Sequence, residues 1–223
     1  MDAGADERGR EVRARLLTDV PQELTVSGPQ LTLRYPREED AQRLFELASD
    51  PDVTRPFSWG PYAKQAQAAA WIAASVRSRN DGFALEFAIV DEAERPAGVI
   101  SLLELSRRDR RAVIGIWIGR EYWGKGAGDE AQALLAQLGF GPLRLERLSA
   151  WVDVENRHSQ RAFERLGFAN EGVLRSWQRH HDRPHDLISY SLLREEFEGS
   201  NMAATKAKIS GDPPDAWVCA ARA

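Results

Sequence analysis

Cysteine and long apolar runs are what this sequence has least of. Cys219 is the only cysteine among 223 residues, so no disulfide can form within the chain, which fits a reducing compartment. No run of about eighteen apolar residues occurs, and we therefore expect no membrane-spanning helix and no membrane partner. The first ten residues lack the apolar core of a signal peptide. These features predict a cytoplasmic protein.

A strong net charge is also absent. The chain has 30 lysines and arginines against 34 acidic residues, a formal net charge of -4, which gives no reason to expect nucleic acid as a partner. With 43% hydrophobic and 29% charged residues, the composition is that of a folded domain. The length allows one domain with a substantial core.

A glycine-rich turn between a strand and a helix is the most informative stretch. Residues 112–118 are apolar and predict a buried strand, and the apolar spacing of residues 127–138 predicts one face of a helix. Between them lie Gly124, Gly126 and Gly128. Glycine lets a ligand approach the backbone, and a helix start offers free N–H groups to a phosphate. The turn therefore predicts a pyrophosphate cradle.

Several kinds of protein have such turns. An ATPase P-loop needs a hydroxyl residue after the lysine, but Gly126 follows Lys125. A dinucleotide fold needs a different glycine spacing in an early βαβ unit. A coenzyme A cradle and a merely tight turn both remain open on the glycines alone.

A second motif lies downstream, at residues 156–168. Asn156 is a good N-cap, Ala162, Phe163 and Leu166 form an apolar stripe, and Gly167 is a stop signal. Together the two motifs resemble the GNAT acyltransferases, which transfer acetyl from acetyl-coenzyme A to an amine, and within them the branch of RimJ/RimL-type ribosomal-protein N-acetyltransferases. The resemblance runs from about residue 30 to residue 198.

The resemblance implies an α/β (α+β) GNAT fold. Its central sheet would be mixed, mostly antiparallel, of about seven strands, splayed after the fourth and flanked by helices, with a bulge near Trp117. We expect an N-terminal extension at 1–28, the domain at 29–198 and a disordered tail at 199–223. The extension could form an amphipathic helix that packs on the domain or on another copy, so a homodimer is one possible arrangement.

The resemblance also implies which residues hold acetyl-CoA. They are Ile116, Trp117, Ile118, Trp123, Gly124, Lys125, Gly126, Ala127, Gly128, Asp129, Asn156 and Ser159. Trp123 and Asp129 depart from the common family pattern, and a carboxylate at position 129 must point away from pyrophosphate or weaken its binding. Phe163 stands where many members have a tyrosine acid. Ser159, at the position of a serine proposed as the acid in RimL-like members, takes that role, unless it only packs the helix.

Glu86 is the expected base, because hairpin register places it in one row with Ser101 and Ile116. It would act through water, unless it is an ordinary strand residue. Trp59 and Tyr62, on a loop, and Trp177, on a late strand, are expected to bind the acceptor or to cover the core. Three of the four histidines gather at 180–185, but their spacing is not that of a zinc site, and we expect no metal.

The sequence therefore predicts an acetyl-CoA-dependent N-acetyltransferase for a primary amine, with a protein or peptide N-terminus favoured. Two alternatives remain open: a small-molecule amine acetyltransferase for an aminoglycoside or polyamine, and a catalytically silent acyl-CoA-binding module. A net-acidic acceptor site would favour polycations.

Overall fold

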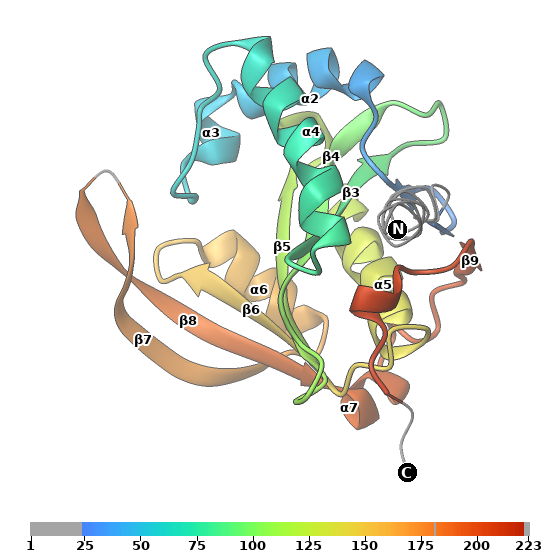
Figure 1. The fold of residues 1–223 in the computed structure, drawn as a ribbon. Coiled ribbons are helices and arrows are strands. Elements are labelled where there is room, and N and C mark those ends of the chain that lie inside the picture. Colours follow the sequence, from blue (N-terminus) through green and yellow to red (C-terminus); the bar gives the residue numbers. More distant parts are fainter. Residues whose placement is uncertain (1–23, 181, 221–223) are drawn as a thin grey trace, which may run out of the picture.

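The computed structural model describes residues 24–180 and 182–220 (Figure 1). One mixed sheet has nine strands in the order β7-β8-β6-β5-β4-β3-β2-β1-β9. The strands are β1 Thr25–Ser27, β2 Thr32–Arg34, β3 Ala84–Val90, β4 Pro96–Ser106, β5 Arg111–Ile118, β6 Arg147–Asp153, β7 Ala169–His180, β8 Arg183–Leu193 and β9 Lys208–Ser210. The α-helices are α2 Ala41–Ala48, α3 Pro51–Thr54, α4 Gln65–Asn80, α5 Ala127–Phe140, α6 Arg157–Arg165 and α7 Arg194–Glu198. This is the predicted GNAT architecture, with nine strands instead of seven.

Both additional strands come from segments expected to lie outside the domain. β1 pairs with β2 on one side and with β9 on the other. Residues 199–220 are therefore not the disordered tail that we predicted, and residues 25–27 belong to the sheet rather than to an extension. Trp217 explains much of this order, because its ring is fully buried and its Nε1 donates to the Arg79 carbonyl at 3.0 Å. The amphipathic helix expected near residues 12–20 lies outside the described residues.

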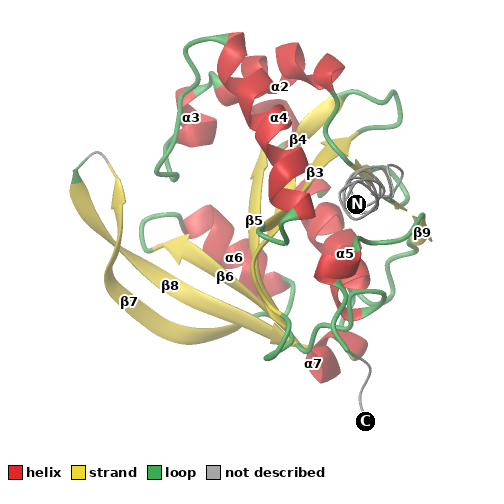
Figure 2. Ribbon diagram, viewed as in Figure 1, coloured by secondary structure: helices red, strands yellow, loops and turns green. Residues whose placement is uncertain are grey.

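The two faces of the sheet carry different helices (Figure 2). One face, here the α5 face, packs Ile100, Ile114 and Val152 with α5 in the main core. The other, here the α4 face, packs Val99 and Trp117 against α2 and α4. The β7–β8 hairpin reaches out beyond the rest of the sheet (Figure 1). No helix in the described ranges is long and apolar enough to cross a bilayer.

From Ala84 to Ile89 the register of β3 and β4 agrees with the sequence argument, although Val90 pairs with Pro96 rather than with Ala97. The register of β4 and β5 differs by one residue. Glu86 faces Ser101, as predicted, but Ser101 faces Gly115 rather than Ile116. The cause is a register shift between Leu103 and Ser106, where Glu104 has φ 51°. A bulge of this kind adds one residue to a strand, and it moves every later pair.

The sheet opens between β5 and β6. These parallel strands pair only over residues 111–113 and 147–149, although β5 continues to Ile118 and β6 to Asp153. The predicted splay is therefore present. The bulge expected near Trp117 is absent from the described pairing, since β5 pairs regularly with β4 from Ile118 back to Val113. β5 stays paired with β4 and β6 stays paired with β8 through Asp153, so the opening lies between two intact pairs of strands.

Candidate functional site

The glycine turn after β5 forms an open cradle at the start of α5. Gly126 caps this helix with φ 82°, and Gly124 has φ 71°. A Cβ added at either glycine would meet nothing within 4 Å, so the space beside the backbone is free. Glu130 is the first residue of the turn whose N–H bonds back, to the Gly126 carbonyl at 3.0 Å. The N–H groups of residues 127–129 therefore have no intrahelical partner, and they fit a pyrophosphate.

Asp129 does not carry an uncompensated charge toward this cradle. Its carboxylate accepts hydrogen bonds from Arg165 Nε at 3.0 Å and Nη2 at 2.8 Å. This hydrogen bond is the main reason why the pKa of Arg165 is raised. The departure from the family pattern at position 129 is thus matched by an arginine on α6, which also ties the cradle to that helix.

Trp123 anchors the cradle to the end of β5. Its Nε1 donates to the Ile118 carbonyl at 2.8 Å, and its ring faces His158 of α6 at 6.5 Å between centroids. The ring pair bridges the two sides of the splay. Lys125 is exposed and leaves a cation beside the cradle.

The backbone of β5 offers alternate residues to the splay. Gly119 N–H donates to the Ala97 carbonyl at 2.8 Å. Because hydrogen-bonded and non-hydrogen-bonded pairs alternate in an antiparallel ladder, Trp117 is bonded to β4, whereas Ile116 and Ile118 point their backbone groups toward β6. The N–H groups of Ile116 and Ile118 and the Ile116 carbonyl therefore face the splay, where they fit a pantetheine chain, while Trp123 takes the Ile118 carbonyl. The Trp117 side chain packs against Trp59.

The α6 motif is built as its sequence predicts. Asn156 Oδ1 accepts from the Ser159 N–H at 3.1 Å and caps the helix. The Ser159 side chain is half-buried. Phe163 is only 4% exposed and packs against Phe168 and Tyr190, at 5.0 and 5.8 Å between centroids. Its ring is fixed in the core, so Ser159 is the hydroxyl that this helix offers.

The α4 face brings together four of the residues singled out from the sequence. Trp59 contacts Tyr62 and Trp117, at 5.5 and 5.7 Å between ring centroids. Burial raises the pKa of Glu86, and a hydrogen bond from Trp71 Nε1 at 2.9 Å opposes that rise. Burial, and then the charge of Glu86, raise the pKa of Tyr62. A half-buried carboxyl group therefore borders an aromatic cluster formed by Trp59, Tyr62 and Trp117.

Trp177 lies apart from this cluster. It is 53% exposed on β7 and packs edge-on against Trp151 of β6, at 5.4 Å. Sequence reasoning missed Trp71, Arg165 and the pairing of His185 with Asp153. In each case the partners are distant in the sequence, and no local pattern joins them.

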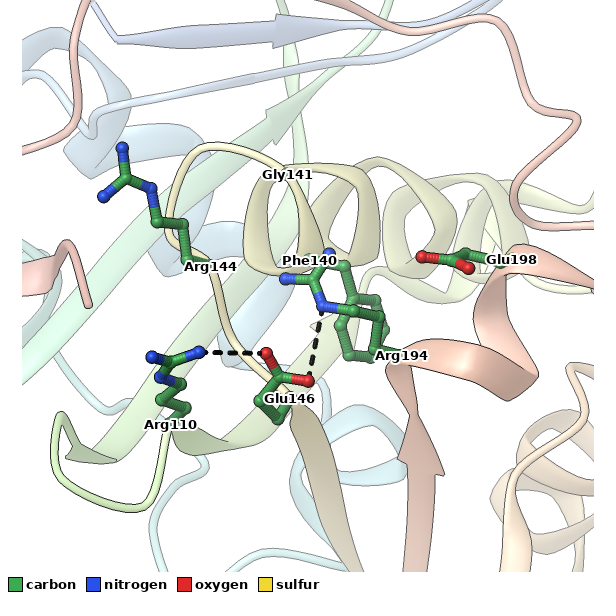
Figure 3. Close-up of a pocket in the computed structure, with 7 residues that line it drawn as sticks. All are labelled: Arg110, Phe140, Gly141, Arg144, Glu146, Arg194 and Glu198. Atoms are coloured by element: carbon green, nitrogen blue, oxygen red, sulfur yellow. Dashed lines mark hydrogen bonds and ion pairs between the residues drawn. The ribbon is translucent and has the colours of Figure 1, made fainter. Parts of the chain in front are cut away.

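The arginine-lined cavity of Figure 3 is not the cradle. It has a volume of about 440 Å³ and lies where α5 ends, whereas the cradle lies where α5 begins. Glu146 there holds Arg110 at 3.3 Å and Arg194 at 3.5 Å. Within the described part of the chain, no three or more His, Cys, Asp or Glu side chains gather as a metal would require.

Comparison with known families agrees with this geometry. The model of the acetyltransferase (GNAT) domain matches residues 30–169, which contain both the cradle and α6. The chain belongs to the GNAT acetyltransferase family. GNAT enzymes use acetyl-CoA, and the open cradle and free N–H groups of this member fit that co-substrate.

Relatives of this GNAT protein span most of its length. It is 35% identical to the uncharacterized N-acetyltransferase p20 of Bacillus licheniformis, over 78% of this chain and 99% of that one. It is 32% identical to YdaF of Bacillus subtilis (strain 168), whose name proposes a ribosomal N-acetyltransferase, over 76% and 94%. It is 29% identical to the spermidine N(1)-acetyltransferase of Escherichia coli (strain K12), over 66% and 77%.

A solved structure agrees with these relatives. The microcin C7 self-immunity acetyltransferase MccE, in complex with acetyl-CoA and AMP, superposes with a TM-score of 0.68 at 26% identity, over 74% of this chain and 93% of that one. The protein is thus an acetyl-CoA-dependent N-acetyltransferase that acts on an amine.

Proposed function

We propose that this GNAT enzyme acetylates the N-terminal amine of a protein or peptide, in the cytoplasm. The carboxyl group at the acceptor site carries this proposal. Glu86 is the carboxyl group that borders the aromatic cluster. A polyamine carries several positive charges, which would call for several carboxylates at the cluster. A peptide N-terminus carries one, which suits one carboxylate.

Glu86 is the proposed base. An N-terminal ammonium must lose a proton before its nitrogen can attack, and a carboxylate with a raised pKa is the stronger base. Because it lies two strands from the splay, Glu86 acts through an intervening water. The rings of Trp59, Tyr62 and Trp117 flank the incoming ammonium and favour it by cation–π attraction.

The other demands of the reaction fall on β5 and α6. Bound acetyl-CoA supplies the acetyl thioester. Gly124, Lys125, Gly126, Ala127, Gly128 and Asp129 hold its pyrophosphate through backbone N–H groups, with Trp123 and Asn156 beside them. The Ile116 N–H donates to the thioester oxygen, which gains charge during attack. Ser159 donates a proton to the departing sulfur.

A small-molecule amine is the second candidate, supported by the name of the spermidine relative. Release of the CoA thiol, measured over a panel of amines, separates the possibilities. Peptides with neutral residues after the N-terminus should react with higher kcat/KM than spermidine or an aminoglycoside. A preference for spermidine would overturn the peptide assignment. Tight acetyl-CoA binding without thiol release from any amine would show a silent binding module.

A further inference from the structure

The α4 face continues across the splay onto β6 and β8. Residues 113 of β5 and 149 of β6 are paired, so odd-numbered residues of both strands share a face. Trp117 therefore lies on the same face as Trp151 and Asp153. Asp153 faces Leu187 of β8, which brings His185 to this face as well.

His185 is held there in a defined way. Its Nδ1 lies 2.7 Å from Asp153 Oδ2, and Asp153 Oδ1 accepts the Glu155 N–H at 2.7 Å. The Asp153 side chain is only 10% exposed, whereas that of His185 is 27% exposed. A carboxylate at Nδ1 keeps the proton on that nitrogen and leaves Nε2 as a hydrogen-bond acceptor. In its neutral form the ring therefore offers a lone pair at Nε2, and it lies beside the His180 ring, at 5.5 Å between centroids.

Strand spacing separates His185 from the reacting nitrogen, which lies at the splay beside β5. Two inter-strand steps, from β5 to β6 and from β6 to β8, lie between them. At about 4.8 Å each these steps amount to roughly 10 Å, and the opening between β5 and β6 adds to that distance. The aromatic cluster lies on the Glu86 side of the splay, and the Trp151–Trp177 pair lies on the His185 side. An acceptor that contacts both sides must be extended.

We propose that His185, oriented by Asp153, binds a backbone N–H of an extended peptide acceptor, several residues beyond the N-terminus that reacts at the splay. The inference rests on the proposed function and narrows it to peptides of about four residues or more, because three extended residues span roughly 10 Å and the splay adds to that distance. His185 is thus a positioning residue that contributes to binding and leaves the chemical step unchanged.

Steady-state kinetics with an octapeptide and with a dipeptide amide of the same N-terminal sequence test the proposal. His185→Ala should raise KM for the octapeptide roughly three- to tenfold, the effect of one hydrogen bond, with kcat unchanged. The dipeptide amide, which cannot reach His185, should show no change. His185→Gln, which keeps an acceptor oxygen, should recover part of the loss.

Asp153→Asn is the second variant. An asparagine amide that donates to Nδ1 moves the histidine proton to Nε2, so the lone pair is lost while the ring stays. KM for the octapeptide should rise as in His185→Ala. Equal changes for both peptides, a wild-type KM in either variant, or a fall in kcat would overturn the proposal. If the wild-type enzyme released no thiol with either peptide, the proposed function itself would fail.

Discussion

At the scale of single residues, Glu86 shows how two neighbours act on one carboxyl group. Burial raises its pKa and the Trp71 hydrogen bond lowers it. If the ionised form is the base, kcat/KM should fall below a pH that lies above the ordinary glutamate pKa of about 4.3. Trp71→Phe removes the lowering influence, so this acid limb should move to higher pH. A pH–rate profile of both proteins measures the shift, and an unmoved limb would contradict the assignment.

Glu86→Gln should lower kcat/KM by about a hundredfold, the usual size of positioned base catalysis. The thermal stability of the Glu86→Gln variant provides the control for this experiment. A raised pKa in the folded state means that ionisation of Glu86 costs stability as the pH rises through that pKa. The neutral glutamine avoids this cost, so Tm at neutral pH should not fall. A large loss of Tm would show that the lost activity reflects unfolding.

Ser159→Ala should lower kcat and kcat/KM together, by about a hundredfold, with little change in acetyl-CoA affinity. A loss below about threefold would remove Ser159 from the mechanism. Adding Phe163→Tyr should not restore the rate, because that ring is buried against Phe168 and Tyr190 and cannot turn toward the sulfur. Kinetics of the single and double variants decide both points.

At the scale of elements, the geometry of the cradle predicts that acetyl-CoA binding depends more on access to the backbone than on side-chain charge. Gly126→Val places a β-branched residue at φ 82° and fills the free space, so acetyl-CoA binding should be abolished. Lys125→Ala should weaken binding modestly. Gly128→Ala is the matched control, since its Cβ would make only an ordinary 3.6 Å contact with Ile118. Calorimetric titration compares the three, and equal losses for Gly126→Val and Lys125→Ala would show that charge dominates.

How much of these elements could be predicted depends on how local their signals are. The glycine turn before α5 and the Asn156 cap are each encoded within a few consecutive residues, and both have the local geometry that the sequence predicted. The predicted β4–β5 register was wrong because Glu104 adopts a left-handed backbone conformation. Non-glycine residues seldom do so, and the sequence therefore did not indicate it. Arg165 with Asp129 and His185 with Asp153 are paired by folding across 36 and 32 positions, which no periodicity reveals.

At the scale of the whole molecule, the segment after α7 should be part of the stable fold. Trp217→Ala removes a fully buried ring and its hydrogen bond to Arg79, which should lower the free energy of unfolding by about 3–5 kcal/mol. Trp177→Ala, at a half-exposed site, should cost much less. Denaturant unfolding of both variants measures this, and equal effects would contradict the packing of Trp217. The sequence could not indicate that the segment after α7 is ordered, because its composition is mostly polar and a single buried residue, Trp217, holds it in place.

The parting of β5 and β6 also has a consequence for hydrogen exchange. The amides of Ile116 and Ile118 sit at the centre of a nine-stranded sheet, where exchange with solvent deuterium is ordinarily among the slowest. Facing the splay, they should instead exchange quickly, while those of Trp117 and its neighbours bonded to β4 stay protected. Coenzyme bound along β5 would accept hydrogen bonds from these two amides and slow their exchange. The coenzyme would then occupy the place where β6 no longer pairs with β5, and the exchange rates of Ile116 and Ile118 would report whether it is bound.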